Sequence, residues 1–180
     1  MLELQAHRCA YCERRTGADR DDGHIEHFRK QADHQEYTLD WVNLYWSCKD
    51  EKTCGKFKDK CTKQAGRLAR FDPADLIDPG AVDPQGYFIF VVDGTVQIRE
   101  GLSADDRRRA QETLRVFQIA DSPYLRLSRA DAVRPYLRAI ASLLPVGRDI
   151  VVSYVQSAMN ETEHVPFATP IQQYLEGFLP

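Results

Sequence analysis

The chain has 180 residues, 43% of them hydrophobic, which is enough to bury a sizeable core without a partner. It contains no run of about 18 apolar residues, so no transmembrane helix is predicted, and its first residues lack the apolar core of a signal peptide. We therefore expect a cytoplasmic protein that makes no membrane contact.

Charge is divided unevenly along the chain. Residues 1–70 hold 14 Lys and Arg against 12 Asp and Glu, a net of +2, whereas residues 71–180 hold 10 against 15, a net of −5. Eight basic residues lie between Lys49 and Arg70, which is typical of either a phosphate-binding patch or a solvated helix face. The total of −3 is unfavourable for binding nucleic acid alone, so a partner would help to hold such a substrate.

The five cysteines all lie between residues 9 and 61. Cys9 and Cys12 form a CxxC pair, and Cys48 and Cys54 supply a second pair with a wider gap. Four thiolates form the closed tetrahedral site that structural zinc prefers. The alternative is a redox CxxC pair, although no βαβ pattern surrounds it. Cys61 is expected to be a free, partly buried thiol, or to replace Cys54 as a ligand.

Between the two cysteine pairs lies GHIEHFRK (23–30), where an acid directly precedes a histidine, and then DWVNLYWSC (40–48). A helix is expected to begin near Cys54. Positions four apart in a helix are neighbours, so Asp59 would share a face with Gly55.

Residues 71–86 are rich in Asp, Pro and Gly and predict a long ordered connection. Residues 87–100 are two β-rich runs around Asp93-Gly94, which predicts a hairpin.

The remainder is predicted to be mostly helical. Ser103 and Asp106 are typical of a capping box that opens a helix reaching about Ala120. A second helix is expected after 128–131, with Pro135 marking either a kink or its true start. Two more are predicted over 147–160 and over 171–178, the last with Thr169 as N-cap and Pro170 at its first position.

The motifs of residues 9–58 resemble the HNH, or ββα-metal, nucleases, in which an acid-His strand, a central Asn-Leu before a cysteine and a helix after the last cysteine build the site. Here those features are Glu26-His27, Asn43-Leu44 and the stretch from Cys54. The fuller pattern CAYCE, GHIEHF, DW-x-NL-x3-C and TCG-x-x-K resembles the HNH subunit of Septu-type anti-phage defence systems, which also occurs as a retron-associated effector.

This resemblance implies an α+β fold, with a zinc-stabilised ββα-metal core over residues 1–70. A β-hairpin and a mostly helical lobe would follow over residues 71–180. The second part holds no catalytic constellation, so we expect it to dock a partner. The resemblance implies an ABC-type ATPase from the same operon and, for some members, a retron reverse transcriptase with its RNA–DNA hybrid.

The resemblance also assigns roles, and elementary chemistry supports them. His27 would be the general base, because histidine titrates near neutral pH. Glu26 would bind Mg²⁺ or another divalent cation, which prefers oxygen ligands. Asn43 would hold the loop that orients His27. The substrate would be DNA or RNA, read through its phosphates.

The chain departs from the family pattern at Gly55, where many members place a metal-binding histidine or asparagine. Asp59 is our candidate for the second metal ligand, with a plain salt bridge as the alternative. The nucleic acid contacts are predicted at basic side chains near the site, and His24 is a candidate second-layer residue on the same strand face as Glu26. The predicted phosphate-contacting residues are Arg29, Lys30, Lys56 and Lys58.

Two other functions stay open at this point. One is a zinc-stabilised module that binds nucleic acid or protein and cuts nothing, which the Gly55 departure and the acidic total favour. The other is a redox protein built on Cys9 and Cys12. Zinc content, thiol reactivity and a cleavage assay separate the three.

Overall fold

In the computed structural model of this protein, residues 3–17, 22–61 and 71–180 are described, except for the side chain of Cys61. Within these ranges the chain forms five α-helices and two small antiparallel sheets, so it is an α+β protein as expected. No helix in the described ranges has the length and apolar character needed to cross a membrane.

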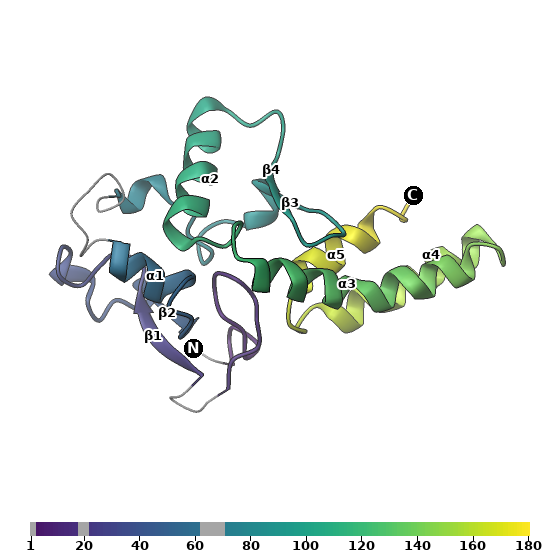
Figure 1. Cartoon of the computed structure of the whole chain (residues 1–180), viewed down its shortest axis with the longest axis horizontal. Coiled ribbons are helices and arrows are strands. Elements are labelled where there is room, and N and C mark those ends of the chain that lie inside the picture. Colours follow the sequence, from purple (N-terminus) through teal and green to yellow (C-terminus); the bar gives the residue numbers. More distant parts are fainter. Residues whose placement is uncertain (1–2, 18–21, 62–70) are drawn as a thin grey trace.

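The N-terminal part is built from two strands and one helix (Figure 1). Strand β1 (Gly23–His27) pairs antiparallel with β2 (Leu44–Cys48), so that Gly23 lies opposite Cys48. Helix α1 (Cys54–Cys61) then packs against β2. This register carries the acid-His end of β1 away from the cysteines and toward the loop that precedes β2.

Two short 3-10 helices shape the loop that joins these strands, η1 (Gln35–Tyr37) and η2 (Trp41–Asn43). The Asp40 side chain caps η2 by accepting a hydrogen bond from the Val42 backbone N–H at 3.2 Å. This cap turns the chain so that Asn43 points inward, and its side chain is fully buried.

The ordered connection and the hairpin are both confirmed. Residues 71–86 contain η3 (Pro73–Asp75) and η4 (Pro84–Gly86), each capped by the aspartate before it. Strands β3 (Phe88–Phe90) and β4 (Val96–Ile98) follow and pair antiparallel. Gly94 takes a φ of +83°, which favours glycine at this turn.

Helix α2 (Ala104–Phe117) begins as predicted, because Ser103 Oγ accepts from the Asp106 backbone N–H at 3.1 Å. It ends three residues before the predicted Ala120. Gln118 adopts a left-handed conformation with a φ of +51°, which stops the helix.

Helix α3 (Pro123–Leu143) begins earlier than predicted, since Ser122 caps it and Pro123 takes the first position. Pro135 therefore lies inside the helix. Helix α4 (Arg148–Thr162) matches its prediction closely. Helix α5 (Ala168–Glu176) has Phe167 at its N-cap position, without a side-chain capping hydrogen bond. The expected Thr169 N-cap is therefore wrong, and Pro170 is the third residue of the helix and not the first; the Thr169 side chain bonds to Glu13 instead.

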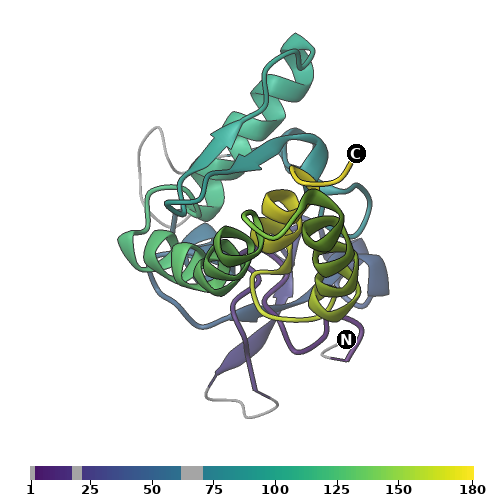
Figure 2. The ribbon, with the colours of Figure 1, turned by 90° about the vertical axis from the view of Figure 1, so that its right-hand side faces the viewer.

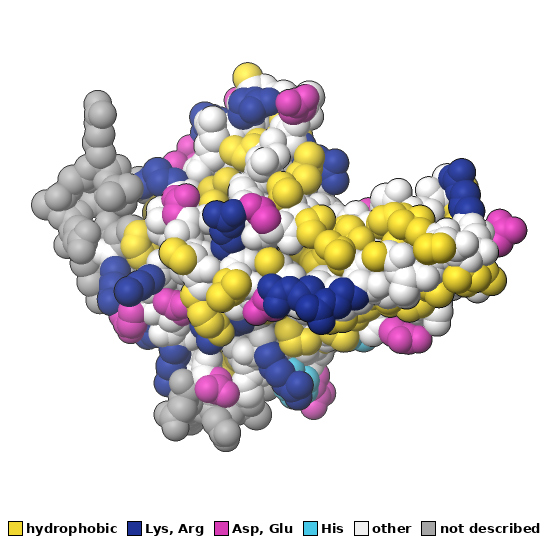
Figure 3. Space-filling model, turned by 45° about the vertical axis from the view of Figure 1, so that its right-hand side comes forward, with side chains coloured by type: hydrophobic (Ala, Val, Ile, Leu, Met, Phe, Trp, Pro, Cys, Tyr) yellow, Lys and Arg dark blue, Asp and Glu magenta, His cyan; other side chains and the backbone are white. Residues whose placement is uncertain are grey.

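Helices α3, α4 and α5 form an arm that extends away from β1, β2 and α1, while α2 and the hairpin lie above (Figures 1 and 2). Hydrophobic side chains line much of this arm on the face shown in Figure 3. Near its tip, Leu144, Val146 and Ile150 are exposed. Together they form an apolar surface that no described residue covers.

One buried cluster joins the first part of the chain to the second. Phe28 from the first part packs with Phe117 of α2, and the same cluster includes Leu125 of α3 and Phe167 before α5. The predicted boundary at residue 70 lies outside the described residues.

Candidate active site and cysteine cluster

The four cysteines predicted to bind zinc lie together. The Sγ atoms of Cys9, Cys12, Cys48 and Cys54 are all within 4.8 Å of one another, and all four side chains are buried. A tetrahedral zinc ion with Zn–S bonds of about 2.3 Å separates its sulfurs by about 3.8 Å. The Cys12 and Cys48 sulfurs are 3.9 Å apart, so the donor set fits such an ion.

Local backbone conformations bring the four thiols together. Glu13, directly after the first pair, has a φ of +59°, and Cys54 has a φ of +57°. Residues other than glycine adopt this region at a cost, which is tolerated where the surrounding structure requires it. Ser47 also links β2 to α1, because its buried hydroxyl accepts a hydrogen bond from the Gly55 backbone N–H at 3.2 Å.

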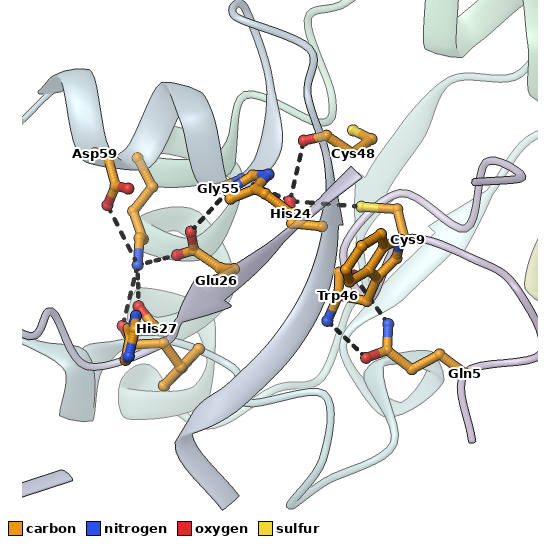
Figure 4. A network of polar contacts seen from close by, with 12 residues as sticks. Gln5, Cys9, His24, Glu26, His27, Trp46, Cys48, Gly55 and Asp59 are labelled. Atoms are coloured by element: carbon orange, nitrogen blue, oxygen red, sulfur yellow. Dashed lines mark hydrogen bonds and ion pairs between the residues drawn. The ribbon is translucent and has the colours of Figure 1, made fainter. Parts of the chain in front are cut away.

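Glu26 lies at the centre of a buried polar group. Its carboxylate contacts the Lys58 ammonium of α1 through Oε1, and Oε2 lies 3.4 Å from His24 Nε2 (Figure 4). Burial alone would raise the pKa of Glu26, but the hydrogen bond with His24 and the positive charge of Lys58 lower it below the usual value. Glu26 is therefore ionised at neutral pH. His24 lies beside Glu26 on the same face of β1, as the alternation of side chains along a strand predicted.

Lys58 differs from its expected role. Its side chain has no exposed surface, and its ammonium donates to the His27 carbonyl oxygen and, at 3.4 Å, to that of Phe28. A fully buried ammonium cannot reach a phosphate from this position. The expected phosphate contact is replaced by an ion pair with Glu26, because burial of the carboxylate makes a buried cation favourable.

Asp59 converges on the same place from the next position of α1. Its Oδ1 lies 3.7 Å from Lys58 Nζ, and its side chain is 48% exposed. Burial and the charge of Glu26 raise the pKa of Asp59. The two carboxylates predicted to bind a cation thus face one centre, which Lys58 holds in this structure.

Gly55 explains how α1 approaches the strand so closely. A Cβ at this position would lie 2.6 Å from the carboxylate carbon of Glu26. Any side chain here would collide with Glu26 unless one of the two moved. This position therefore faces Glu26 directly, and glycine leaves the carboxylate to Lys58 and His24.

His27 ends β1 and is partly exposed. Its Nε2 lies 3.0 Å from the Thr38 carbonyl oxygen. A carbonyl oxygen only accepts, so Nε2 must carry the proton, and in the neutral ring Nδ1 is then the proton acceptor. Nδ1 makes no hydrogen bond to any residue in the described ranges.

Asn43 holds the segment that follows His27. Its Oδ1 accepts from the Arg29 backbone N–H at 2.6 Å, and its Nδ2 donates to the carbonyl oxygens of Arg29 and Tyr37 at 3.0 and 3.1 Å. The Asn43 backbone carbonyl also accepts from Phe28 at 2.9 Å. Four hydrogen bonds thus clamp the chain on both sides of the loop that carries Thr38.

The remaining basic candidates lie around this site. The Arg29 guanidinium is 4.9 Å from the centre of the Tyr37 ring, and Lys30 Nζ is 5.4 Å from that of Phe71. Both side chains are partly exposed, as is Lys56 on α1. They have the exposure that a phosphate contact requires.

Sequence reasoning missed two contributors. Thr38 acts through its backbone carbonyl, which no sequence signal marks. The role of Ser47 could have been predicted, because a polar side chain on a strand beside the buried cysteines needs a hydrogen-bond partner.

A comparison with known protein families finds no family model that matches this chain, and a comparison with curated proteins finds no match either.

Proposed function

We propose that this protein is a metal-dependent HNH-type endonuclease subunit that hydrolyses phosphodiester bonds of DNA or RNA. The observation that carries the proposal is the hydrogen bond from His27 Nε2 to the Thr38 carbonyl. It leaves Nδ1 as a proton acceptor on a partly exposed ring, in the residue whose backbone carbonyl accepts from the Lys58 ammonium that Glu26 and Asp59 also face. The order of strand, loop, strand and helix around it is the order expected for a ββα-metal core, which supports the proposal.

In the proposed reaction, a water molecule loses a proton to Nδ1 of His27 while its oxygen forms a bond to phosphorus. The bond from phosphorus to the 3′ oxygen breaks in line, and the leaving oxygen takes a proton from solvent. Asn43 is a positioning residue, because it holds the loop whose Thr38 carbonyl sets the tautomer of His27. Arg29, Lys30 and Lys56 are candidates for binding the phosphates of the substrate.

Glu26 and Asp59 are the side chains that would hold a divalent cation such as Mg²⁺, which supplies positive charge to the phosphate and the leaving oxygen when bound. Their oxygen atoms suit a hard cation. The four cysteines would hold a structural zinc ion, whose role is to join β2, α1 and the N-terminal segment.

We further propose that the protein works in an anti-phage defence complex with an ABC-type ATPase. Two features support a partner on residues 71–180: the net charge of −5 and the exposed apolar side chains at the tip of the arm. A retron reverse transcriptase with its RNA–DNA hybrid is a further candidate partner.

A non-catalytic binding module is the second candidate function. The specific observation in its favour is the ion pair between Lys58 and Glu26, which occupies the centre that a catalytic cation needs.

A cleavage assay separates the two candidates. Wild-type protein, His27→Ala and His34→Ala would be incubated with labelled DNA and RNA and Mg²⁺ or Mn²⁺, with and without the ATPase. His34 is the matched control, because it is a partly exposed histidine outside the site. We expect cleavage by wild type and His34→Ala and a loss of about 100-fold or more in His27→Ala. Equal cleavage by His27→Ala would overturn the assignment of the base, and no cleavage by any protein would favour the binding module.

A further inference from the structure

We infer that the oxygen atoms around the Lys58 ammonium form a divalent-cation site for which Lys58 itself competes, so that the cation enters only as Lys58 swings out. This inference rests on the proposed function, because it concerns the cation of the same site. It adds a residue that controls when that cation is bound.

Among the described residues, four oxygen atoms surround the ammonium as polar partners and form a cage. Glu26 supplies a carboxylate oxygen in direct contact, and the backbone carbonyl of His27 supplies another. The Phe28 carbonyl lies at 3.4 Å and the Asp59 carboxylate at 3.7 Å (Figure 4). Carboxylate and carbonyl oxygens are the ligands that hard divalent cations take in proteins. In this structure the cation bound by these oxygen atoms is the Lys58 ammonium.

The balance of charge favours a divalent ion over the ammonium. Glu26 and Asp59 contribute two carboxylates, and the Lys58 ammonium offers a single positive charge to both. The Glu26 side chain is only 1% exposed, so its charge is stabilised by a nearby cation and not by water. A divalent ion would neutralise both carboxylates.

The two cations exclude one another. An ammonium in contact with Glu26 Oε1 occupies the space in which a metal would bind the same oxygen, and like charges at such a distance repel strongly in a buried site. The exposed half of Asp59 gives the cage a side open to solvent. Once displaced, the long Lys58 side chain would remain attached to α1 beside that opening, where its charge would face a substrate phosphate.

The test measures Mn²⁺ binding by the loss of the free Mn²⁺ electron paramagnetic resonance signal, with zinc-loaded protein and no nucleic acid. Lys58→Met removes the competing charge. Lys52→Met is the control, because it removes the same charge from an exposed position outside the cage. If Lys58 occupies the cage nine-tenths of the time or more, Lys58→Met should bind Mn²⁺ about tenfold more tightly than wild type and than Lys52→Met.

Removing Lys58 also leaves the buried Glu26 carboxylate without its ion-pair partner, so the variant is expected to be less stable. Thermal unfolding turns this into a second readout: millimolar Mn²⁺ or Mg²⁺ should raise the Tm of Lys58→Met several degrees more than that of wild type. The double variant Glu26→Gln, Lys58→Met should fold without metal and show no such rise.

Expulsion of the lysine is tested in wild-type protein by acetylation and mass spectrometry. Lys58 should be protected without Mn²⁺ and labelled at saturating Mn²⁺, while Lys52 is labelled equally in both. Equal Mn²⁺ affinity in Lys58→Met and Lys52→Met, or a Lys58 that stays protected with Mn²⁺ bound, would overturn the inference. Neither result depends on cleavage, so a failure of the nuclease proposal would be seen separately.

Discussion

Glu13, the residue directly after Cys12, accepts two hydrogen bonds from Thr169, which lies at the start of α5. The Thr169 hydroxyl donates to Oε1 at 2.6 Å and the Thr169 backbone N–H to Oε2 at 3.0 Å. The Glu13 backbone carbonyl also accepts from Phe167 at 3.1 Å. The last helix is thus fastened to the turn that shapes the cysteine cluster.

Replacing Thr169 with Val should destabilise the protein by about 2 kcal/mol, because the partly buried Glu13 carboxylate loses a short hydrogen bond. Urea unfolding would measure the loss. Ser153→Ala, an exposed position on α4, is the control and should change stability by less than about 0.5 kcal/mol. Equal stability of Thr169→Val and wild type would show that the tie contributes nothing.

Asn43 offers a graded test of the loop clamp. Asn43→Ala leaves partly buried backbone groups of Arg29 and Tyr37 without this partner and should cost about 2–4 kcal/mol. Asn43→Asp should cost at least as much, because its second oxygen would face two carbonyl oxygens where the amide now donates. Chemical denaturation of both variants checks the order. An aspartate variant more stable than the alanine variant would contradict the assigned amide orientation.

Gly55→Ala should destabilise the protein by about 1–3 kcal/mol through overlap with the Glu26 carboxylate, although alanine favours a helix by about 1 kcal/mol over glycine. Gly86→Ala is the matched control, since a Cβ there meets no atom within 4 Å. Increased stability of Gly55→Ala would mean that Glu26 moves aside freely.

The Glu26 carboxylate should make stability depend on pH on the acidic side. Its pKa in the folded protein is lowered from 4.5, so its ionised form stabilises the fold above about pH 4.5, and this contribution is lost as pH falls through the lowered pKa. Glu26→Gln should therefore lose less stability than wild type between about pH 5 and about pH 3. Both proteins keep the cysteines, so acid release of a zinc ion affects them equally. Parallel curves of unfolding free energy against pH would contradict the prediction.

Experiment can decide whether Cys54 or Cys61 is the fourth zinc ligand. Cys54→Ser should lower zinc content well below one ion per chain and lower the Tm, because metal binding contributes to folding. Cys61→Ser should retain one zinc ion, measured by atomic emission on purified protein. If Cys61→Ser lost the zinc, the ligand set would have to be redrawn.

Much of the local structure was predictable from sequence. The Asp93-Gly94 turn and the Ser103 cap are signals carried by residues close together in the chain, and the residue type alone marked the four cysteines as a set. The errors came where long-range contacts decided the outcome. Thr169 was predicted to cap α5, but its hydroxyl is bound by Glu13, 156 residues away.

The candidate site shows the same division. The sequence alone determined which chemical groups are present: an acid beside a histidine, an asparagine before a leucine, four clustered thiols and a lysine-rich helix. Only the tertiary structure decided that Lys58 is buried against Glu26 and not exposed to a phosphate, and that Thr38 sets the tautomer of His27. The reason is physical: whether a charge is solvated or paired depends on which atoms surround it in space, and α1 meets β1 only after the chain has folded.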